Sequence, residues 1–175
     1  MNLNLDLTDE GYDKILFRLM AVLLDHVDVR LLAELQTDAD RPNVELARIV
    51  GLSPAATLNR VRRLKESGVL RRITARLDST AAGFPLQVYV TVTLARHDDA
   101  AHRRFAETVL ALPQVIAADW VTGEVDAMVM VVARDVAELQ RVLNRLAARG
   151  GTRVVTLLRL EELKPASPLP IEPAR

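Results

Sequence analysis

The spacing of apolar residues changes near residue 86 and divides the chain into two parts. Before residue 68 apolar residues recur every three or four positions, which predicts helices, whereas from Leu86 to Leu94 they alternate with polar residues, which predicts a half-buried strand. The expected elements are helices at 25–37, 43–50 and 53–67, then strand 86–94, helix 99–112, strands 114–121 and 125–133, helix 135–149 and strand 152–163.

Residues 43–68 predict two short helices joined by a tight turn. Asn43 is expected to cap the first helix, and Gly51 stands where a helix ends in a left-handed turn. Ser53 is expected to cap the second helix, with Pro54 at its first position and Gly68 at its end. A turn this short favours the steep crossing of a helix-turn-helix, whose second helix enters the major groove of DNA.

The second of these helices is expected to bury Leu58, Val61 and Leu64 and to expose polar and basic side chains. Its first half is predicted to contact base edges and its second half to contact phosphates. The alternative is an ordinary helix with a solvated arginine face. A strand at 69–77 would add a wing. The predicted DNA-binding residues are Ser53, Ala55, Ala56, Thr57, Asn59, Arg60, Arg62, Arg63, Lys65, Arg71 and Arg72.

The distribution of charge supports this hypothesis, although the net charge of the 175 residues is zero. Residues 46–76 carry eight basic side chains against Glu66 alone, whereas residues 78–163 have a slight acidic excess. A single basic block in a neutral chain is typical of a local nucleic-acid footprint. The chain has no cysteine, which excludes disulfides and cysteine zinc sites and favours a cytoplasmic location, and no apolar run is long enough to cross a membrane.

The second part reads β-α-β-β-α-β, the order of a ferredoxin-like domain with two helices on one face of an antiparallel sheet. Strand 125–133 has apolar residues on both faces, with Val129 and Val131 on one side and Met128 and Met130 on the other. Two helices can cover only one face. We therefore expect a second copy of the chain to cover the other face, which predicts a dimer.

The chain is expected to have five segments, and the first has two open readings. Residues 1–19 are either a short extra helix or an extension that depends on the choice of start site. The second alternative arises because Met20 would be a natural first residue of the protein. The proline-rich end is expected to be disordered. The expected boundaries are an N-terminal extension 1–24, a winged helix-turn-helix 25–77, a hinge 78–86, a ferredoxin-like domain 87–164 and a tail 165–175.

Three stretches together resemble the Lrp/AsnC family of transcription regulators. They are LDHVDVRLLAELQTDAD (24–40), ELARIVGLSPAATLNRVRRLKESGVLRR (45–72) and VTGEVDAMVMVV (121–132), followed by a last strand ending TLLRLEELK (156–164). The resemblance implies an α+β fold with a winged helix-turn-helix and a ferredoxin-like (RAM-type, ACT-like) sensing domain. It also implies binding to double-stranded DNA, dimers that often assemble into octameric rings, and an effector that is commonly an amino acid.

The resemblance implies effector contacts at Thr122, Gly123 and Asp126, within the family's G-x-x-D turn. Asp126 could pair with an α-ammonium group, and the N–H groups of the turn could hold a carboxylate. The alternative is that Gly123 merely turns the hairpin and Asp126 caps it. The family often has an aromatic residue near Asp126, where this chain has Ala127 and Met128, and the neighbouring aromatic here is Trp120.

Two other functions remain open at this point. Relatives of the same architecture include sirohaem decarboxylases, but no nucleophile–base pair stands out in this chain, so no catalytic residue is expected. The run His97-Asp98-Asp99 lacks a convergent third ligand, so neither a metal nor another cofactor is expected. A pure interaction module would explain the dimer but would leave the basic helix without a role.

Overall fold

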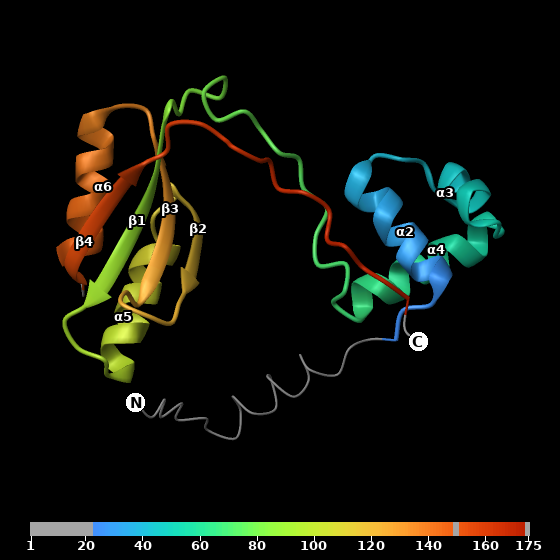
Figure 1. Ribbon diagram of the computed structural model, residues 1–175, viewed down its shortest axis with the longest axis horizontal. Coiled ribbons are helices and arrows are strands. Elements are labelled where there is room, and N and C mark those ends of the chain that lie inside the picture. Colours follow the sequence, from blue (N-terminus) through green and yellow to red (C-terminus); the bar gives the residue numbers. More distant parts are fainter. Residues whose placement is uncertain (1–22, 149–150, 174–175) are drawn as a thin grey trace. The chain divides into compact units, whose positions relative to one another are not determined.

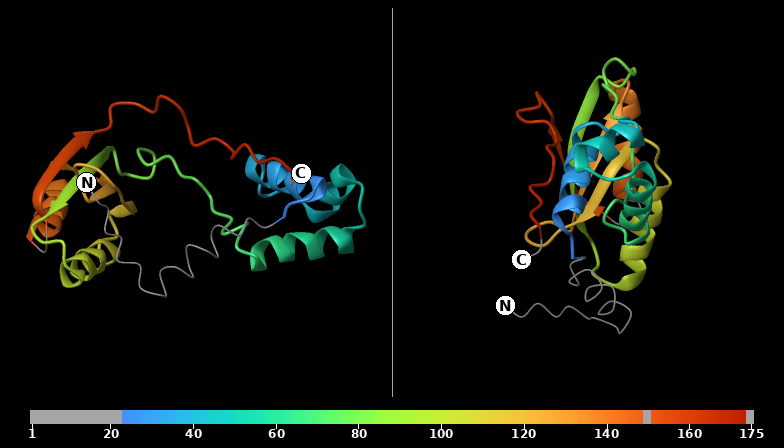
Figure 2. Two further views of the ribbon diagram at one scale, coloured as in Figure 1. Left: turned by 60° about the horizontal axis from the view of Figure 1, so that its bottom comes forward. Right: turned by 90° about the vertical axis from the view of Figure 1, so that its right-hand side faces the viewer.

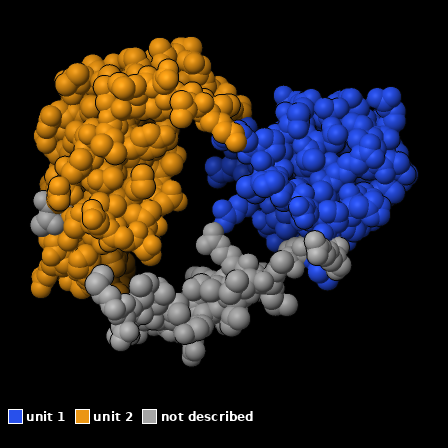
Figure 3. All heavy atoms as spheres, in the orientation of Figure 1, with its two compact units in different colours: residues 1–74, 166–175 blue, residues 75–165 orange. Residues whose placement is uncertain are grey.

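The structure is a computed structural model that describes residues 23–148 and 151–173. The expectations for residues 1–19 lie outside these ranges. The chain forms two compact units, residues 1–74 with 166–175 and residues 75–165, which Figure 3 distinguishes by colour. Each unit is described by itself.

The described part of the first unit contains helices α2 (His26–Thr37), α3 (Asn43–Val50) and α4 (Pro54–Glu66) (Figure 1). Its core is formed by Leu31, Leu35 and Leu46, against which Val61 and other partly buried side chains pack. The carboxylate of Asp25 caps α2 by accepting the N–H groups of Val27 and Asp28 at 2.9 and 2.8 Å. The predicted helices are therefore present, and they pack through their apolar stripes.

The turn between α3 and α4 has the expected geometry. Gly51 has a φ of 72°, in the left-handed region that glycine adopts without steric cost. The Ser53 hydroxyl accepts the N–H of Ala56 at 3.2 Å, and Pro54 occupies the first turn of α4. The role of Asn43 differs from the prediction. The carbonyl of Pro42 already accepts the N–H groups of Glu45 and Leu46, so α3 begins at Asn43, whose amide donates to the Pro54 carbonyl at 2.8 Å.

The wing expected at residues 69–77 is not a paired strand in the structure. After α4 the chain closes with a bond from the Leu70 N–H to the Leu64 carbonyl, and residues 71–78 have no regular secondary structure. A strand needs a neighbour to complete its hydrogen bonds, and none of the described strands pairs with this segment. The first unit is thus a helix-turn-helix followed by an exposed basic segment.

The second unit has the predicted β-α-β-β-α-β order, which confirms the ferredoxin-like fold (Figures 1 and 2). Its sheet is antiparallel with strand order β2-β3-β1-β4. Some elements are shorter than expected, because α5 ends at Leu110 and the last strand at Leu158. The elements are β1 (Leu86–Leu94), α5 (Asp99–Leu110), β2 (Val115–Trp120), β3 (Ala127–Ala133), α6 (Val136–Ala148) and β4 (Gly151–Leu158).

One face of this sheet forms the core, and the other face bears exposed apolar side chains. Val88, Val90 and Val92 of β1 are buried together with residues from α5 and α6, including Phe105 and Leu146. The opposite face is formed by the alternate residues of the strands. Tyr89 stands beside Met130 and Leu157 in the ladder, and Thr91 stands beside Met128 and Val155. Tyr89, Met128, Val155 and Leu157 are all exposed.

The segment after β4 contains no helix or strand among the described residues, but hydrogen bonds and ion pairs hold it at two points. Near its start, Glu162 accepts from Arg76 at 2.6 Å and pairs with Arg159 at 2.9 Å. Further on, the main chain of Leu169 exchanges two hydrogen bonds with the side-chain amide of Gln36 in α2, at 2.7 and 3.4 Å. The structure differs here from the expectation of a disordered tail, because the amide of Gln36 satisfies both main-chain groups of Leu169.

Candidate functional site

The outer face of α4 presents a stripe of small, polar and basic side chains. Ala55, Leu58, Asn59 and Arg62 recur at the spacing that places residues on one side of a helix, and all are exposed. Ser53 at the cap and Lys65 in the last turn are also exposed, and Ala56 is partly buried. This face has the chemistry expected for a helix that enters the major groove.

Thr57 and Leu58 exchange the roles that the sequence predicted for them. Thr57 is completely buried, and its hydroxyl donates to the Ser53 carbonyl one turn earlier at 3.0 Å. Leu58, expected in the core, has half of its surface exposed. The reason is geometric. Residues 57, 61 and 64 follow the 3.6-residue repeat and lie on one side of the helix, whereas residues 58, 61 and 64 are spaced by three and drift around it. Thr57 is therefore removed from the candidate base-contacting residues.

Arg60 and Arg63 bind a buried carboxylate in α2. Asp28 is completely buried, and its two oxygens accept from the guanidinium groups of Arg60, at 2.9 Å, and of Arg63. Arg60 also binds the carboxylate of Asp25 at 2.6 Å. These hydrogen bonds to Asp25 and Asp28 raise the pKa of Arg60 above its ordinary value. The N–H of Asp28, with help from Arg60, holds the pKa of Asp25 below its ordinary value.

In this structure Arg60 is therefore held by two carboxylates of the protein itself, and Arg63 is shared between Asp28 and the surface. A signal for this cluster was present in the sequence. Asp25 and Asp28 are one helical turn apart, as are Arg60 and Arg63, so the two pairs match in spacing. The predicted basic residues that remain exposed and have no recorded carboxylate partner among the described residues are Arg62, Lys65, Arg71 and Arg72.

The turn between β2 and β3 contains the three predicted effector-binding residues. Thr122 and Gly123 are exposed, and Gly123 has a φ of 126°, which a side chain would strain. Asp126 is turned toward the end of β1, where its Oδ2 accepts the N–H of Leu94 at 2.7 Å. Its Oδ1 lies 3.5 Å from Nδ1 of His97, and 24% of the side chain is exposed. Asp126 thus ties the turn to β1 and still presents one oxygen.

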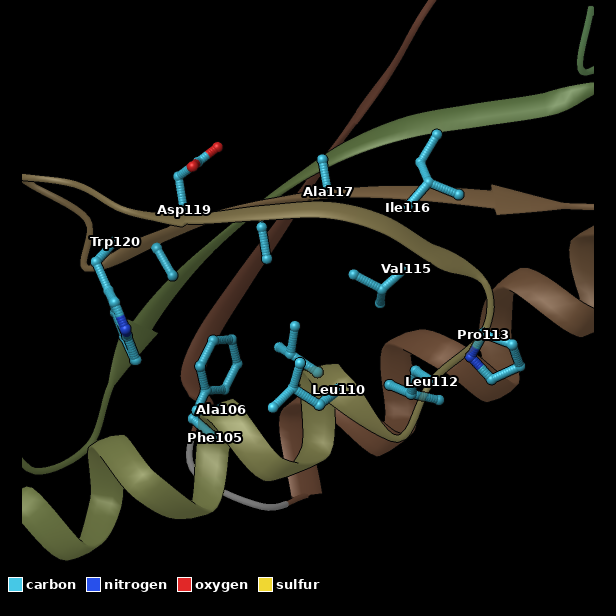
Figure 4. A pocket seen from close by; sticks show the side chains of 13 residues that line it. Phe105, Ala106, Leu110, Leu112, Pro113, Val115, Ile116, Ala117, Asp119 and Trp120 are labelled. Atoms are coloured by element: carbon cyan, nitrogen blue, oxygen red, sulfur yellow. The ribbon is translucent and has the colours of Figure 1, made fainter. Parts of the chain in front are cut away.

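A groove of about 470 Å³ runs between α5 and the edge strand β2 (Figure 4). Phe105 and Trp120 lie on its walls with ring centroids 5.5 Å apart, and His102 meets Trp120 edge-on at 5.0 Å. The lining is apolar except for Asp119. Thr122, Gly123 and Asp126 do not line the groove, although the chain passes directly from Trp120 into their turn.

Asp98, in the acidic run that follows His97, has a structural role. The carboxylate of Asp98 caps α5 by accepting the N–H of Ala101 at 2.7 Å, which lowers the pKa of Asp98. Within residues 23–148 and 151–173, no three metal-ligating side chains come together. Nor does any helix in those ranges combine the length and hydropathy needed to span a membrane.

A helix-turn-helix with a basic outer face, followed by a ferredoxin-like domain with an apolar groove, defines a DNA-binding transcription regulator that carries its own ligand-binding domain. Residues 24–65 match the AsnC-type helix-turn-helix domain, and residues 87–169 match the Lrp/AsnC ligand binding domain. The chain belongs to the Lrp/AsnC family of transcription regulators.

Curated and solved relatives agree with this assignment. The chain is 38% identical over 147 residues to a leucine-responsive regulatory protein of Rhizobium meliloti, covering 83% of this chain and 94% of that protein. It is 37% identical over 150 residues to the transcriptional regulator AldR of Mycolicibacterium smegmatis, covering 83% and 86%. The solved complex of the regulator NMB0573 with L-Met from Neisseria meningitidis is similar with a TM-score of 0.77 and 30% identity, covering 84% and 96%.

Proposed function

We propose that this regulator reads duplex DNA with the outer face of α4 and changes its assembly when an amino acid or related molecule binds the second unit. The observation that carries the DNA part is the composition of that face. Ala55 and Asn59 sit beside Arg62 on one exposed stripe, whereas the aliphatic and threonine side chains that pack the helix lie opposite. Two such helices held in a dimer would read two half-sites at a fixed spacing.

The proposed DNA contacts fall into two groups. Ser53, Ala55, Ala56 and Asn59 lie in the first half of α4, which reaches base edges in a helix-turn-helix, and asparagine can bond adenine through two hydrogen bonds. Exposed basic residues farther along are proposed to bind phosphates, since they follow the reading half of the helix. They are Arg62, Lys65, Arg71 and Arg72.

The uncovered face of the sheet supports a dimer as the assembling unit. Tyr89, Met128 and Leu157 present exposed apolar surface on that face, while α5 and α6 pack on the other. A self-complementary contact between two sheets would remove this surface from water. We propose that the effector controls a further step, in which dimers assemble into larger rings.

The effector is proposed to bind at the turn between β2 and β3. Asp126 Oδ1 would accept from the α-ammonium group, and the N–H groups of Thr122 and Gly123 would hold the carboxylate. The groove that begins at Trp120 would receive an apolar side chain of the effector. The complex of NMB0573 with L-Met is consistent with an effector of this class.

DNA binding is tested by fluorescence anisotropy of a labelled random duplex at a series of salt concentrations. We expect the affinity to fall steeply as salt rises, because each phosphate contact releases counterions. Arg62→Ala should reduce the slope of log K against log salt by about 1, whereas Arg103→Ala, which removes an exposed arginine of α5, should leave it unchanged. Absence of binding at low salt would contradict the proposal.

The effector site is tested by thermal shift and light scattering with each of the common amino acids. Asp126→Asn keeps an oxygen that can accept the Leu94 N–H but removes the charge proposed to bind the ammonium group. We expect this variant to keep its unliganded Tm and to lose the ligand-induced shift. Glu124→Gln, which removes a charge from an exposed position of the same turn, should keep the shift. A retained response in Asp126→Asn would place the ligand elsewhere.

A further inference from the structure

Leu58 lies on the outer face of α4 rather than in the core. Half of its surface is exposed, and its neighbours on the helix surface are Ala55, three residues before it, and Arg62, four residues after it. An isolated exposed leucine is ordinary. This leucine differs in its position, because it lies along the edge of the stripe that is proposed to read DNA. It is one turn from Ala55 and from Arg62, and about 100–120° around the helix from the buried Thr57 and Leu64.

We propose that Leu58 is a specificity-determining residue that contacts the 5-methyl group of a thymine in the major groove, beside the adenine read by Asn59. This inference rests on the proposed function, in which α4 is the reading helix. Among base edges in the major groove, only thymine presents a methyl group, and an apolar side chain is its natural partner. Asn59 is the next residue along the chain and has the amide that pairs with adenine.

The preference has an attractive and a repulsive component. In the free protein the exposed half of Leu58 faces water, so contact with a methyl group removes apolar surface from water on both sides. Against cytosine, the same side chain would cover an amino group without offering it an acceptor, and burying such a group unpaired is unfavourable. Leu58 therefore favours thymine and disfavours its replacement by cytosine at one position of each half-site.

The experiment uses the full chain and a duplex selected by it from a random pool. Each thymine of the selected site is replaced in turn by deoxyuridine, which removes only the methyl group. We expect the wild-type protein to lose affinity roughly fourfold at one thymine per half-site, the factor for losing one methyl-sized apolar contact. Leu58→Ala should bind the unmodified site more weakly and become insensitive to deoxyuridine at that thymine, while Leu58→Met should remain sensitive.

The control variants distinguish the role of Leu58 from the proposed role of α4 as the reading helix. Leu23→Ala truncates another exposed leucine, 80% of whose surface is accessible, outside α4, and should keep the wild-type sensitivity. If Asn59→Ala and Arg62→Ala bind the selected site as wild type does, α4 is not the reading helix and both proposals fail. If those variants lose affinity but no deoxyuridine affects the wild type, or if Leu58→Ala stays sensitive, the role of Leu58 alone is refuted.

Discussion

Asp28 is the position at which one substitution should loosen the DNA-reading helix without touching its outer face. Its buried carboxylate accepts from Arg60 and Arg63, and so joins α2 to α4. Asp28→Asn keeps the size of the side chain and one acceptor oxygen but removes the negative charge. Both guanidinium groups would then face a neutral amide in place of the buried carboxylate, although Arg60 would keep its contact with Asp25.

The expected loss of stability follows from the exposure of the two arginines. A hydrogen bond to a charged group that is shielded from water contributes about 1.5–3 kcal/mol to the free energy of unfolding. The side chains of Arg60 and Arg63 are 28% and 57% exposed, so water can replace part of what they lose. We therefore expect Asp28→Asn to lower the free energy of unfolding of the first unit by about 2 kcal/mol.

The measurement should report on α4 itself. Hydrogen exchange of peptides within residues 54–66 should accelerate roughly 30-fold if the helix opens with about 2 kcal/mol less cost. The chain's single tryptophan, Trp120, lies in the second unit, so urea unfolding followed by its fluorescence serves as an internal control and should not change. Asp40→Asn, which removes a charge from an exposed turn of the first unit, is the matched variant. Equal exchange of α4 in the two variants would refute the reasoning.

Two further predictions concern the buried hydroxyl of Thr57 and the carboxylate of Glu138 in the first turn of α6. Thr57→Val keeps the buried shape but removes the hydrogen bond to the Ser53 carbonyl, so we expect α4 to lose about 1 kcal/mol of stability, measured by hydrogen exchange of residues 54–66. Discrimination between selected and random DNA should not change, and a loss of discrimination would return Thr57 to the DNA interface. The Arg134 N–H, followed by Gln114, holds the pKa of Glu138 below its ordinary value of 4.5. Because the pKa of Glu138 is lower in the folded state, its carboxylate stabilises the fold above the ordinary pKa, and this stabilisation is lost as pH falls through the folded-state pKa. The wild type should therefore lose stability on acidification below about pH 4.5, and Glu138→Gln should lose less. Identical pH profiles of the two proteins, measured by Trp120 fluorescence, would contradict this.

The parts of the fold that depend on local chemistry could be predicted from the sequence. Gly51, Ser53 and Pro54 act through their own backbone preferences, so the helix-turn-helix was readable without knowing its neighbours. The alternation in β1 likewise reports directly on which face is buried. These signals were sufficient for the order of elements and the fold class.

The parts that depend on distant partners could not be predicted in the same way. Arg60 looked like a phosphate ligand because its carboxylates come from another helix, 32 and 35 residues away in the chain. Thr57 looked exposed because a polar residue was not expected in the core, yet its hydroxyl is satisfied by its own helix. Residues 69–77 looked like a strand because extended sequence patterns do not reveal whether a pairing partner exists.

The contact between Gln36 and Leu169 has a consequence for the order in which the protein is completed during synthesis. The two residues are 133 positions apart in the chain. Helices α2, α3 and α4 of the first unit are synthesised before the second unit and have their own apolar core, so they can pack before the second unit exists. The amide of Gln36 cannot form these bonds until Leu169 has been synthesised, so the DNA-binding unit receives this contact only after the whole second unit has been made.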